Sequence, residues 1–144
     1  KEIDDNIEIF RKAFDAGVPF ICGSESGFSV TPYGDWHYKE LEVFVNKLKM
    51  TPLEAITCAT KNAAKAMRKE NILGLISPGY KADLLVIDGD PSKDVSILGK
   101  KELIKHVILD GKEVDLTPAP ERIKDPDGWR ISSYSGKILK KNNS

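Results

Sequence analysis

Apolar positions at the start of the chain recur with the spacing of one helical face. They are Ile3, Ile7, Phe10 and Phe14, three or four residues apart as in an amphipathic helix. Gly17 follows where the C-terminal cap of such a helix belongs. The next residues, Val18–Cys22, are apolar without interruption, which is typical of a strand buried on both faces. The pattern therefore predicts a helix over 3–16 and then a buried strand.

A polar stretch over 24–37, rich in Ser, Gly, Pro and aromatic residues, separates this strand from the next helical pattern. Loops of this length inside compact domains are usually functional or disordered. The helix after the loop is predicted from apolar residues that share one face: Leu41, Phe44, Val45 and Leu48.

The segment Thr51–Glu54 carries the signals of a third helix start. Thr51 suits the N-cap, Pro52 suits the first helical position, and Glu54 completes a capping box. The helix behind it is rich in alanine, which permits close approach to a neighbouring sheet or helix. Its core-facing stripe is predicted to consist of Leu53, Ile56, Ala63 and Met67.

In the second half of the chain the pattern changes from helical to extended. Residues 83–88 read Asp-Leu-Leu-Val-Ile-Asp, a strand with an apolar centre. Residues 103–109 and 112–114 flank the pair Asp110-Gly111, which is a strong signal for a two-residue hairpin. This half is therefore predicted to be rich in β-structure.

The composition is that of an ordinary globular protein and disfavours several classes of partner. Among 144 residues, Lys plus Arg and Asp plus Glu both total 22, so the zero net charge leaves no basic footprint for nucleic acid. No apolar stretch approaches the roughly 20 residues that span a membrane. Two cysteines, Cys22 and Cys58, make no disulfide framework, and both are predicted to be small buried packing residues in a cytoplasmic protein. The N-terminus lacks a Met and a signal-peptide pattern, so we expect a truncated or processed chain.

The most informative polar residue is Glu25, which directly follows the predicted buried strand. Its neighbours Ser24 and Ser26 are too small to cover its carboxylate. In barrels of alternating strands and helices, catalytic groups lie at the C-terminal ends of strands. The alternative is a strand that leaves the core through a turn, with Glu25 solvated. Catalysis by a serine nucleophile would need a base, and the sequence suggests no plausible triad.

The remaining polar residues favour structural roles. His106 lies on an alternating strand and is predicted to occupy a core or edge position. Asp88 and Asp90 are predicted to form turns rather than a metal pair. A structural zinc site is not supported, because there is no CxxC motif and His37 and His106 lie far apart in the sequence.

Eight short motifs occur in one order between residues 1 and 115. They are Gly23-Ser24-Glu25-Ser26-Gly27, Pro32-Tyr33-Gly34-Asp35-Trp36-His37, Glu40-Leu41, Met50-Thr51-Pro52-Leu53-Glu54-Ala55-Ile56, Ala59-Thr60-Lys61-Asn62-Ala63-Ala64, Pro78-Gly79-Tyr80-Lys81-Ala82-Asp83-Leu84, Asp88-Gly89-Asp90-Pro91 and Asp110-Gly111-Lys112-Glu113-Val114. Together they resemble the C-terminal part of a metal-dependent amidohydrolase, in the branch of imidazolonepropionase-like and prolidase-like enzymes.

This resemblance implies an α/β fold. Residues 1–72 would form the terminal part of a (β/α)8 barrel, with its last helix–strand–helix units. Residues 73–116 would supply strands of a small β-sandwich domain. Residues 117–144, which are rich in Pro, Ser, Lys and Asn, are predicted as an extended tail with a frayed end.

The resemblance also implies a chemistry. Enzymes of this superfamily use one or two divalent metals, here expected to be zinc, to activate a water that attacks an amide, urea-like or dipeptide C–N bond. A carboxylate after the eighth strand, usually Asp, contacts the metal or the water and shuttles the proton. Glu25 stands at that position, one methylene longer, through natural variation or engineering. Tyr33, Trp36 and His37 would contact a small-molecule substrate, although His37 also suits a helix start and Trp36 a packing role.

The superfamily's other metal ligands lie upstream of the part that this chain resembles. We therefore expect the isolated chain to be inactive, to bind no metal tightly, and to associate with an N-terminal portion or to form a homo-oligomer. The alternative from a different class is a non-catalytic assembly module, in which an unpaired strand edge docks to a partner chain.

Overall fold

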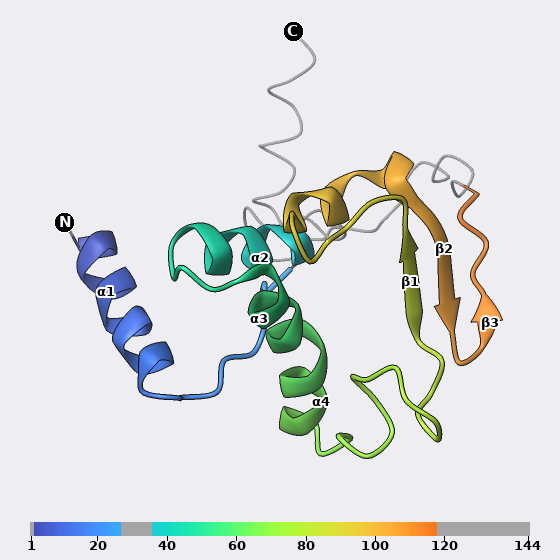
Figure 1. The fold of residues 1–144 in the computed structure, drawn as a ribbon, viewed down its shortest axis with the longest axis horizontal. Coiled ribbons are helices and arrows are strands. Elements are labelled where there is room, and N and C mark those ends of the chain that lie inside the picture. Colours follow the sequence, from blue (N-terminus) through green and yellow to red (C-terminus); the bar gives the residue numbers. More distant parts are fainter. Residues whose placement is uncertain (1, 27–35, 118–144) are drawn as a thin grey trace, which may run out of the picture.

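The computed structural model describes residues 2–26 and 36–117, and Figure 1 shows helices followed by a small sheet. Tyr33 and the predicted tail beyond residue 117 lie outside the described part. The elements in chain order are α1 (Glu2–Asp15), α2 (His37–Asn46), α3 (Pro52–Thr57), the π-helical turn η1 (Cys58–Asn62), α4 (Ala63–Ala66), β1 (Leu84–Ile87), the 3₁₀ helices η2 (Val95–Gly99) and η3 (Lys101–Leu103), β2 (Ile104–Leu109) and β3 (Lys112–Glu113). Within the described ranges, no helix combines the length and the apolar character that crossing a membrane requires.

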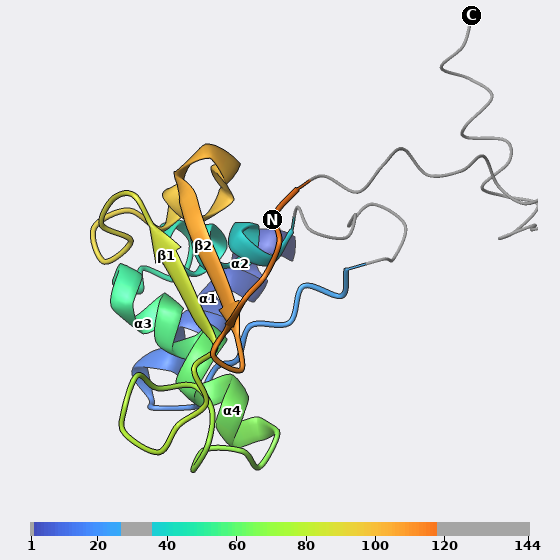
Figure 2. The same ribbon diagram turned by 90° about the vertical axis from the view of Figure 1, so that its right-hand side faces the viewer.

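The first helix confirms the sequence pattern, whereas the strand predicted after it is not formed. Gly17 adopts a left-handed φ of 81° and ends α1, as a glycine cap does. Residues 18–24 run as a drawn-out segment (Figure 2), and residues 18–25 belong to no sheet among the described residues. Val18 and Ile21 are each 50% exposed, so the prediction of a strand buried on both faces is wrong for this structure. The reason is that a central strand needs a neighbour on either side, and the described chain supplies none.

Phe20 is the residue that fastens this extended segment to the helices. Its ring makes edge-to-face contacts with Phe10 and Phe14 of α1 and with Phe44 of α2, at centroid distances of 6.4, 6.0 and 6.2 Å. Such geometry is favourable for aromatic pairs. The segment is therefore held by side-chain packing rather than by a strand ladder.

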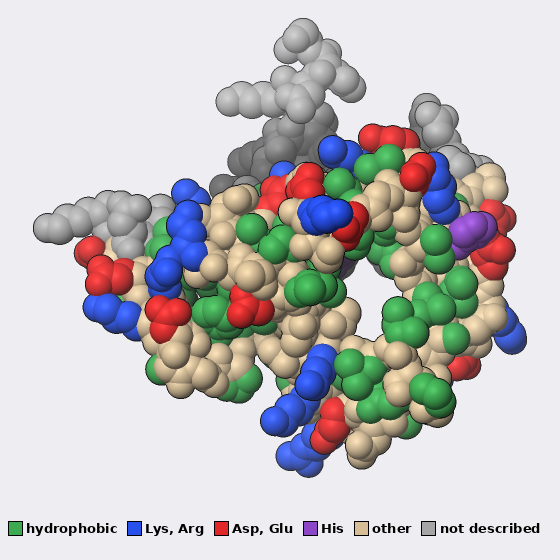
Figure 3. Space-filling view, viewed as in Figure 1, with side chains coloured by type: hydrophobic (Ala, Val, Ile, Leu, Met, Phe, Trp, Pro, Cys, Tyr) green, Lys and Arg blue, Asp and Glu red, His purple; other side chains and the backbone are tan. Residues whose placement is uncertain are grey.

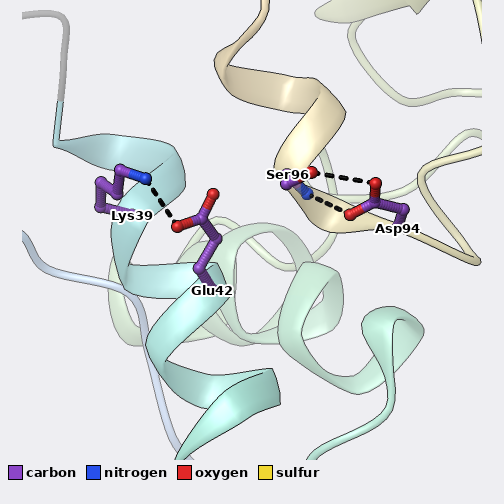
Figure 4. Close-up of polar contacts among 4 residues, drawn as sticks. All are labelled: Lys39, Glu42, Asp94 and Ser96. Carbon is purple, nitrogen blue, oxygen red and sulfur yellow. Dashed lines mark hydrogen bonds and ion pairs between the residues drawn. The ribbon is translucent and has the colours of Figure 1, made fainter.

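One buried cluster links the helical half to the second half. Its members are Leu41, Phe44, Leu48, Met50, Ala55, Cys58 and Val95. Val95 comes from η2, whose N-terminus is capped by Asp94: the two carboxylate oxygens accept hydrogen bonds from the backbone N–H and the hydroxyl of Ser96, both at 2.9 Å (Figure 4). The cap orients η2 so that Val95 enters the core beside α2.

The capping box before α3 is present as predicted. The Thr51 hydroxyl accepts the Glu54 N–H at 3.3 Å, and the Glu54 carboxylate accepts the Thr51 N–H at 2.7 Å. The predicted core stripe is only partly right, because Leu53 and Met67 are 59% and 61% exposed. Small residues, Ala55 among them, face the core instead, and η1 rotates the residues after it relative to a regular helix.

The three strands form an antiparallel sheet in the order β1-β2-β3, with Leu84 opposite Ile108. Figure 2 shows β1 and β2 side by side, with α1 and α2 behind them. Asp110 and Gly111 connect β2 to β3 with φ values of 51° and 77°. Two positive φ values are those of a type I′ turn, so the predicted hairpin is confirmed.

Candidate functional site

Glu25 lies at the end of the extended segment, in a left-handed backbone conformation with φ of 48°. This conformation is uncommon for a residue other than Gly, Asn or Asp. The side chain lines a cavity of about 610 Å³ between α1, residues 20–25 and α2. The cavity walls are largely apolar, and Phe10, Ile21 and Val43 contribute to them. The structure therefore places Glu25, an exposed residue, among the residues that line an apolar recess.

The backbone just before Glu25 is held by a second carboxylate. One oxygen of Glu40, Oε2, accepts the backbone N–H of Gly23 at 2.8 Å and the thiol of Cys22 at 3.1 Å. Burial, together with this hydrogen bond and the charge of Glu40, raises the pKa of the Cys22 thiol to about 12. The thiol is therefore protonated at neutral pH and acts as a donor. The prediction of a buried packing residue is right for Cys58, which is 2% exposed, but Cys22 is only partly buried.

A second contact from the same turn of α2 reaches the loop. Nδ1 of His37 lies 3.1 Å from the Ser24 hydroxyl, which is 2.8 Å from the Ser26 hydroxyl. The structure thus brings an imidazole to Ser24, which the sequence alone did not suggest. Within residues 2–26 and 36–117, no hydrogen bond joins His37 to a carboxylate, the group that orients the base of a Ser–His–acid triad. The contact is therefore read as a structural hydrogen bond that joins the loop to α2.

The predicted site residues are only partly brought together. Trp36, 39% exposed, lines the same cavity as Glu25. His37 points to Ser24 instead of lining this cavity, and Tyr33 lies outside the described residues. Their roles toward a substrate stay predictions. Glu40 was missed as a functional candidate, although it stands in the Glu40-Leu41 motif, because its partners, the Gly23 N–H and the Cys22 thiol, lie 17 and 18 residues away in the sequence.

The described side chains do not by themselves make a metal centre. Among residues 2–26 and 36–117, no group of three or more His, Cys, Asp or Glu residues is placed to hold an ion. The Glu40 carboxylate is engaged by Gly23 and Cys22. A metal held at this cavity would therefore need ligands beyond the described residues.

The other polar candidates have structural roles. Asp90 accepts the backbone N–H of Ser92 at 3.1 Å, as expected of a turn former. The ring of His106 lies at an exposed sheet position, where Nδ1 is 2.6 Å from a carboxylate oxygen of Glu113. His106 is therefore exposed and does not lie in the core. Its acidic partner Glu113, across the hairpin, was not expected from the sequence.

A sequence profile of the amidohydrolase family matches residues 2–114. The chain belongs to the amidohydrolase family. Among curated proteins, this amidohydrolase chain is 31% identical over 110 residues to an ochratoxinase of Aspergillus niger and 32% identical over 103 residues to an imidazolonepropionase of Flavobacterium johnsoniae. These matches cover 76% and 71% of the chain, and 22% and 25% of the relatives.

The chain is also similar to solved structures of hydrolases. The amidohydrolase chain superposes on a Xaa-Pro dipeptidase with a TM-score of 0.65 at 36% identity, covering 76% of this chain and 25% of that one. It superposes on the Aspergillus niger ochratoxinase with a TM-score of 0.68 at 30% identity, covering 76% of this chain and 24% of that one. The chain thus spans about a quarter of the length of the proteins it matches.

Proposed function

We propose that this chain supplies the C-terminal portion of a metal-dependent hydrolase of C–N bonds, with Glu25 as its catalytic carboxylate. The observation that carries the proposal is the position of Glu25. It ends the extended segment that the resemblance aligns with the eighth barrel strand, and it lines a cavity, as catalytic groups do at strand ends in barrel enzymes. The membership of residues 2–114 in the amidohydrolase family supports this reading.

In this proposal Glu25 holds and moves one proton. A divalent metal, expected to be zinc, would when bound lower the pKa of a water and polarise the scissile carbonyl. Glu25 would accept the proton of that water and return it to the leaving amine. Since the described residues offer no complete ligand set, the other ligands would come from an N-terminal portion of the enzyme.

The substrate class proposed is a small molecule with an amide, urea-like or dipeptide C–N bond. The printed names of two similar proteins, a Xaa-Pro dipeptidase and an imidazolonepropionase, support this class. Trp36 lines the cavity beside Glu25, which supports a substrate contact. For His37 and Tyr33 a substrate contact is proposed from the family resemblance alone.

A second candidate, a non-catalytic assembly module, is favoured by one observation. The extended segment leaves Val18 and Ile21 half-exposed, and a segment with exposed apolar side chains that belongs to no sheet in the described chain invites pairing with another chain. Analytical ultracentrifugation of the 144-residue chain tests this candidate. A monomer at micromolar concentration contradicts docking between copies, and a chain that neither self-associates nor binds an N-terminal portion contradicts the assembly role.

The catalytic proposal is tested by hydrolysis of Xaa-Pro dipeptides and N-acyl amino acids, followed by amine release in the presence of zinc. We expect activity when the chain is expressed with the N-terminal portion of its enzyme and none from the chain alone. Glu25→Gln keeps the size but loses the basic oxygen, so turnover should fall by about 10²- to 10⁴-fold. Glu25→Asp shortens the reach and should lower turnover by up to about a hundredfold.

The matched control is Glu70→Gln, which removes an exposed carboxylate beyond α4 and should leave turnover unchanged. Turnover by Glu25→Gln within twofold of the parent would show that Glu25 is not the proton shuttle. Stoichiometric, tight zinc on the isolated chain in equilibrium dialysis would show that the ligand set is complete without an N-terminal portion.

A further inference from the structure

We propose that Glu40 is a positioning residue that fixes the backbone carrying Glu25. The inference rests on the proposed function of Glu25, and it goes beyond that function by assigning a role to a residue on a different element. Glu40 stands in the first turn of α2, 17 positions after Gly23 in the sequence. Its contact is therefore a tertiary one, made across the fold to the segment that ends at Glu25.

The contact joins a charged acceptor to the loop at two consecutive residues. Both the Gly23 N–H and the Cys22 thiol donate to the same oxygen of Glu40, at 2.8 and 3.1 Å. Hydrogen bonds to an ionised acceptor are shorter and about twice as strong as neutral ones. The Gly23 nitrogen lies two residues before Glu25. Fixing its position therefore restricts where the backbone of Glu25 can lie.

Other hydrogen bonds hold this segment further from Glu25: Asn62 donates to the Phe20 carbonyl at 2.9 Å, and the Cys22 N–H donates to the Cys58 carbonyl at 3.3 Å. Glu40 holds the peptide nitrogen two residues before Glu25. Residues 18–25 belong to no sheet in the described chain, and Glu25 adopts φ of 48°. A non-glycine residue in this region persists only where its surroundings fix it. A further tie, from Ser24 to His37 at 3.1 Å, comes from the same first turn of α2. That turn therefore clamps the three residues before Glu25.

The raised pKa of Cys22 is in part a consequence of the same contact. Burial is its largest cause, and the hydrogen bond and negative charge of Glu40 add to it. A thiol that stays protonated remains a donor to Glu40 throughout the neutral range. Cys22 is thus part of the anchor and is not a nucleophile in this arrangement.

The chain offers a matched control on the same helix. Glu42 lies two residues after Glu40 and pairs instead with Lys39, at 2.7 Å from its Nζ (Figure 4). Glu42→Gln therefore removes the same charge from the same helix without touching the loop. Glu40→Gln keeps one neutral acceptor for Gly23, whereas Glu40→Ala keeps none, so a positioning role predicts a graded loss.

The first measurement is amide hydrogen exchange by NMR on the 144-residue chain. In Glu40→Ala, the Gly23 amide should exchange about tenfold faster or more, since a hydrogen bond to a charged group is lost. Glu40→Gln should give a smaller increase, and Glu42→Gln none. An unchanged exchange rate of the Gly23 amide in Glu40→Ala would overturn the positioning role of Glu40 and would leave the proposed role of Glu25 untouched. If Glu40→Ala fails to fold, the comparison of the parent with Glu40→Gln still tests the inference. The Gly23 amide must be protected from exchange in the parent and exchange faster in Glu40→Gln; an unprotected amide in the parent would overturn the inference.

The second measurement is steady-state kinetics of the assembled enzyme. A displacement of about 1 Å can lower turnover about a hundredfold, so kcat should fall in the order parent, Glu40→Gln, Glu40→Ala, with KM within about threefold. A purely structural role would lower the melting temperature and leave kcat unchanged below it. Full activity of Glu25→Gln refutes the proposed function. Loss of activity in Glu25→Gln with unchanged kcat in Glu40→Ala refutes the positioning role alone.

Discussion

Gly74 is a position where a single added methyl group should clearly destabilise this structure. It has a φ of 85°, and a Cβ built there would lie 2.8 Å from the Thr60 carbonyl oxygen, 2.9 Å from the Ala64 Cβ and 3.0 Å from the Lys61 Cα. Two of these atoms belong to the backbone of η1, which cannot move aside as a flexible side chain can. Gly74→Ala must therefore shift the turn after α4 away from the helix.

The expected loss of stability has two parts that a second glycine separates. Gly79 has a nearly identical φ of 88°, but a Cβ there would meet nothing within 4 Å. Alanine in the left-handed region costs about 1–2 kcal/mol, and this is the whole effect expected for Gly79→Ala. Overpacking adds about 1–3 kcal/mol, so Gly74→Ala should lose roughly 2–5 kcal/mol.

Urea unfolding of the 144-residue chain, followed by far-UV circular dichroism, measures both variants. The midpoints should fall for both, further for Gly74→Ala, while the slope m stays unchanged if the native surface is preserved. Equal losses of stability for the two variants would refute the reasoning, because they would show that the contacts of Gly74 with η1 add nothing to the backbone term.

Three further predictions concern local contacts. Thr51→Ala should destabilise the chain by about 1 kcal/mol in thermal unfolding, whereas Thr57→Ala, which removes only a bond to the Leu53 carbonyl, should change little. Hydrogen bonds from Thr51 lower the pKa of Glu54, so the stabilisation they give is present above the ordinary pKa of 4.5 and is lost as the pH falls through the lowered value. Cys22, with its pKa raised to about 12, should react slowly with iodoacetamide at pH 8, and Glu40→Gln should accelerate the reaction; equal rates would contradict the contact.

The features predicted correctly from the sequence are those whose signal and structure both lie within a few residues. The capping box joins Thr51 to Glu54, the hairpin turn is formed by Asp110 and Gly111, and Gly17 ends α1. In each case the residue type itself supplies the needed atom or dihedral angle. No partner distant in the sequence is required, so the pattern alone is sufficient.

The strand predicted over 18–22 shows where local pattern stops being sufficient. An apolar run indicates that a segment is buried, but a strand also needs a neighbouring backbone to pair with. The described chain gives Cys22 a single backbone acceptor, the Cys58 carbonyl at 3.3 Å, and Phe20 provides the packing. Likewise, one partner of Glu40 is the N–H of Gly23, a donor that every residue except proline carries. The other is the thiol of Cys22, 18 residues away in the sequence, so no local pattern predicts the contact.

Glu25 is the residue at which local preference and the proposed role disagree. At φ of 48°, Asp and Asn are better tolerated than Glu, because a short polar side chain can hydrogen-bond locally. An aspartate would therefore suit this backbone better, and it is also the usual residue in the family that the chain resembles. Backbone strain of this kind concentrates at functional sites, which favours a glutamate kept for its extra reach. Glu25→Asp tests whether the glutamate is kept for its reach. If it is, the variant should be as stable as the parent or more stable, while its turnover falls. Unchanged turnover would mean that the added methylene serves no purpose in the reaction.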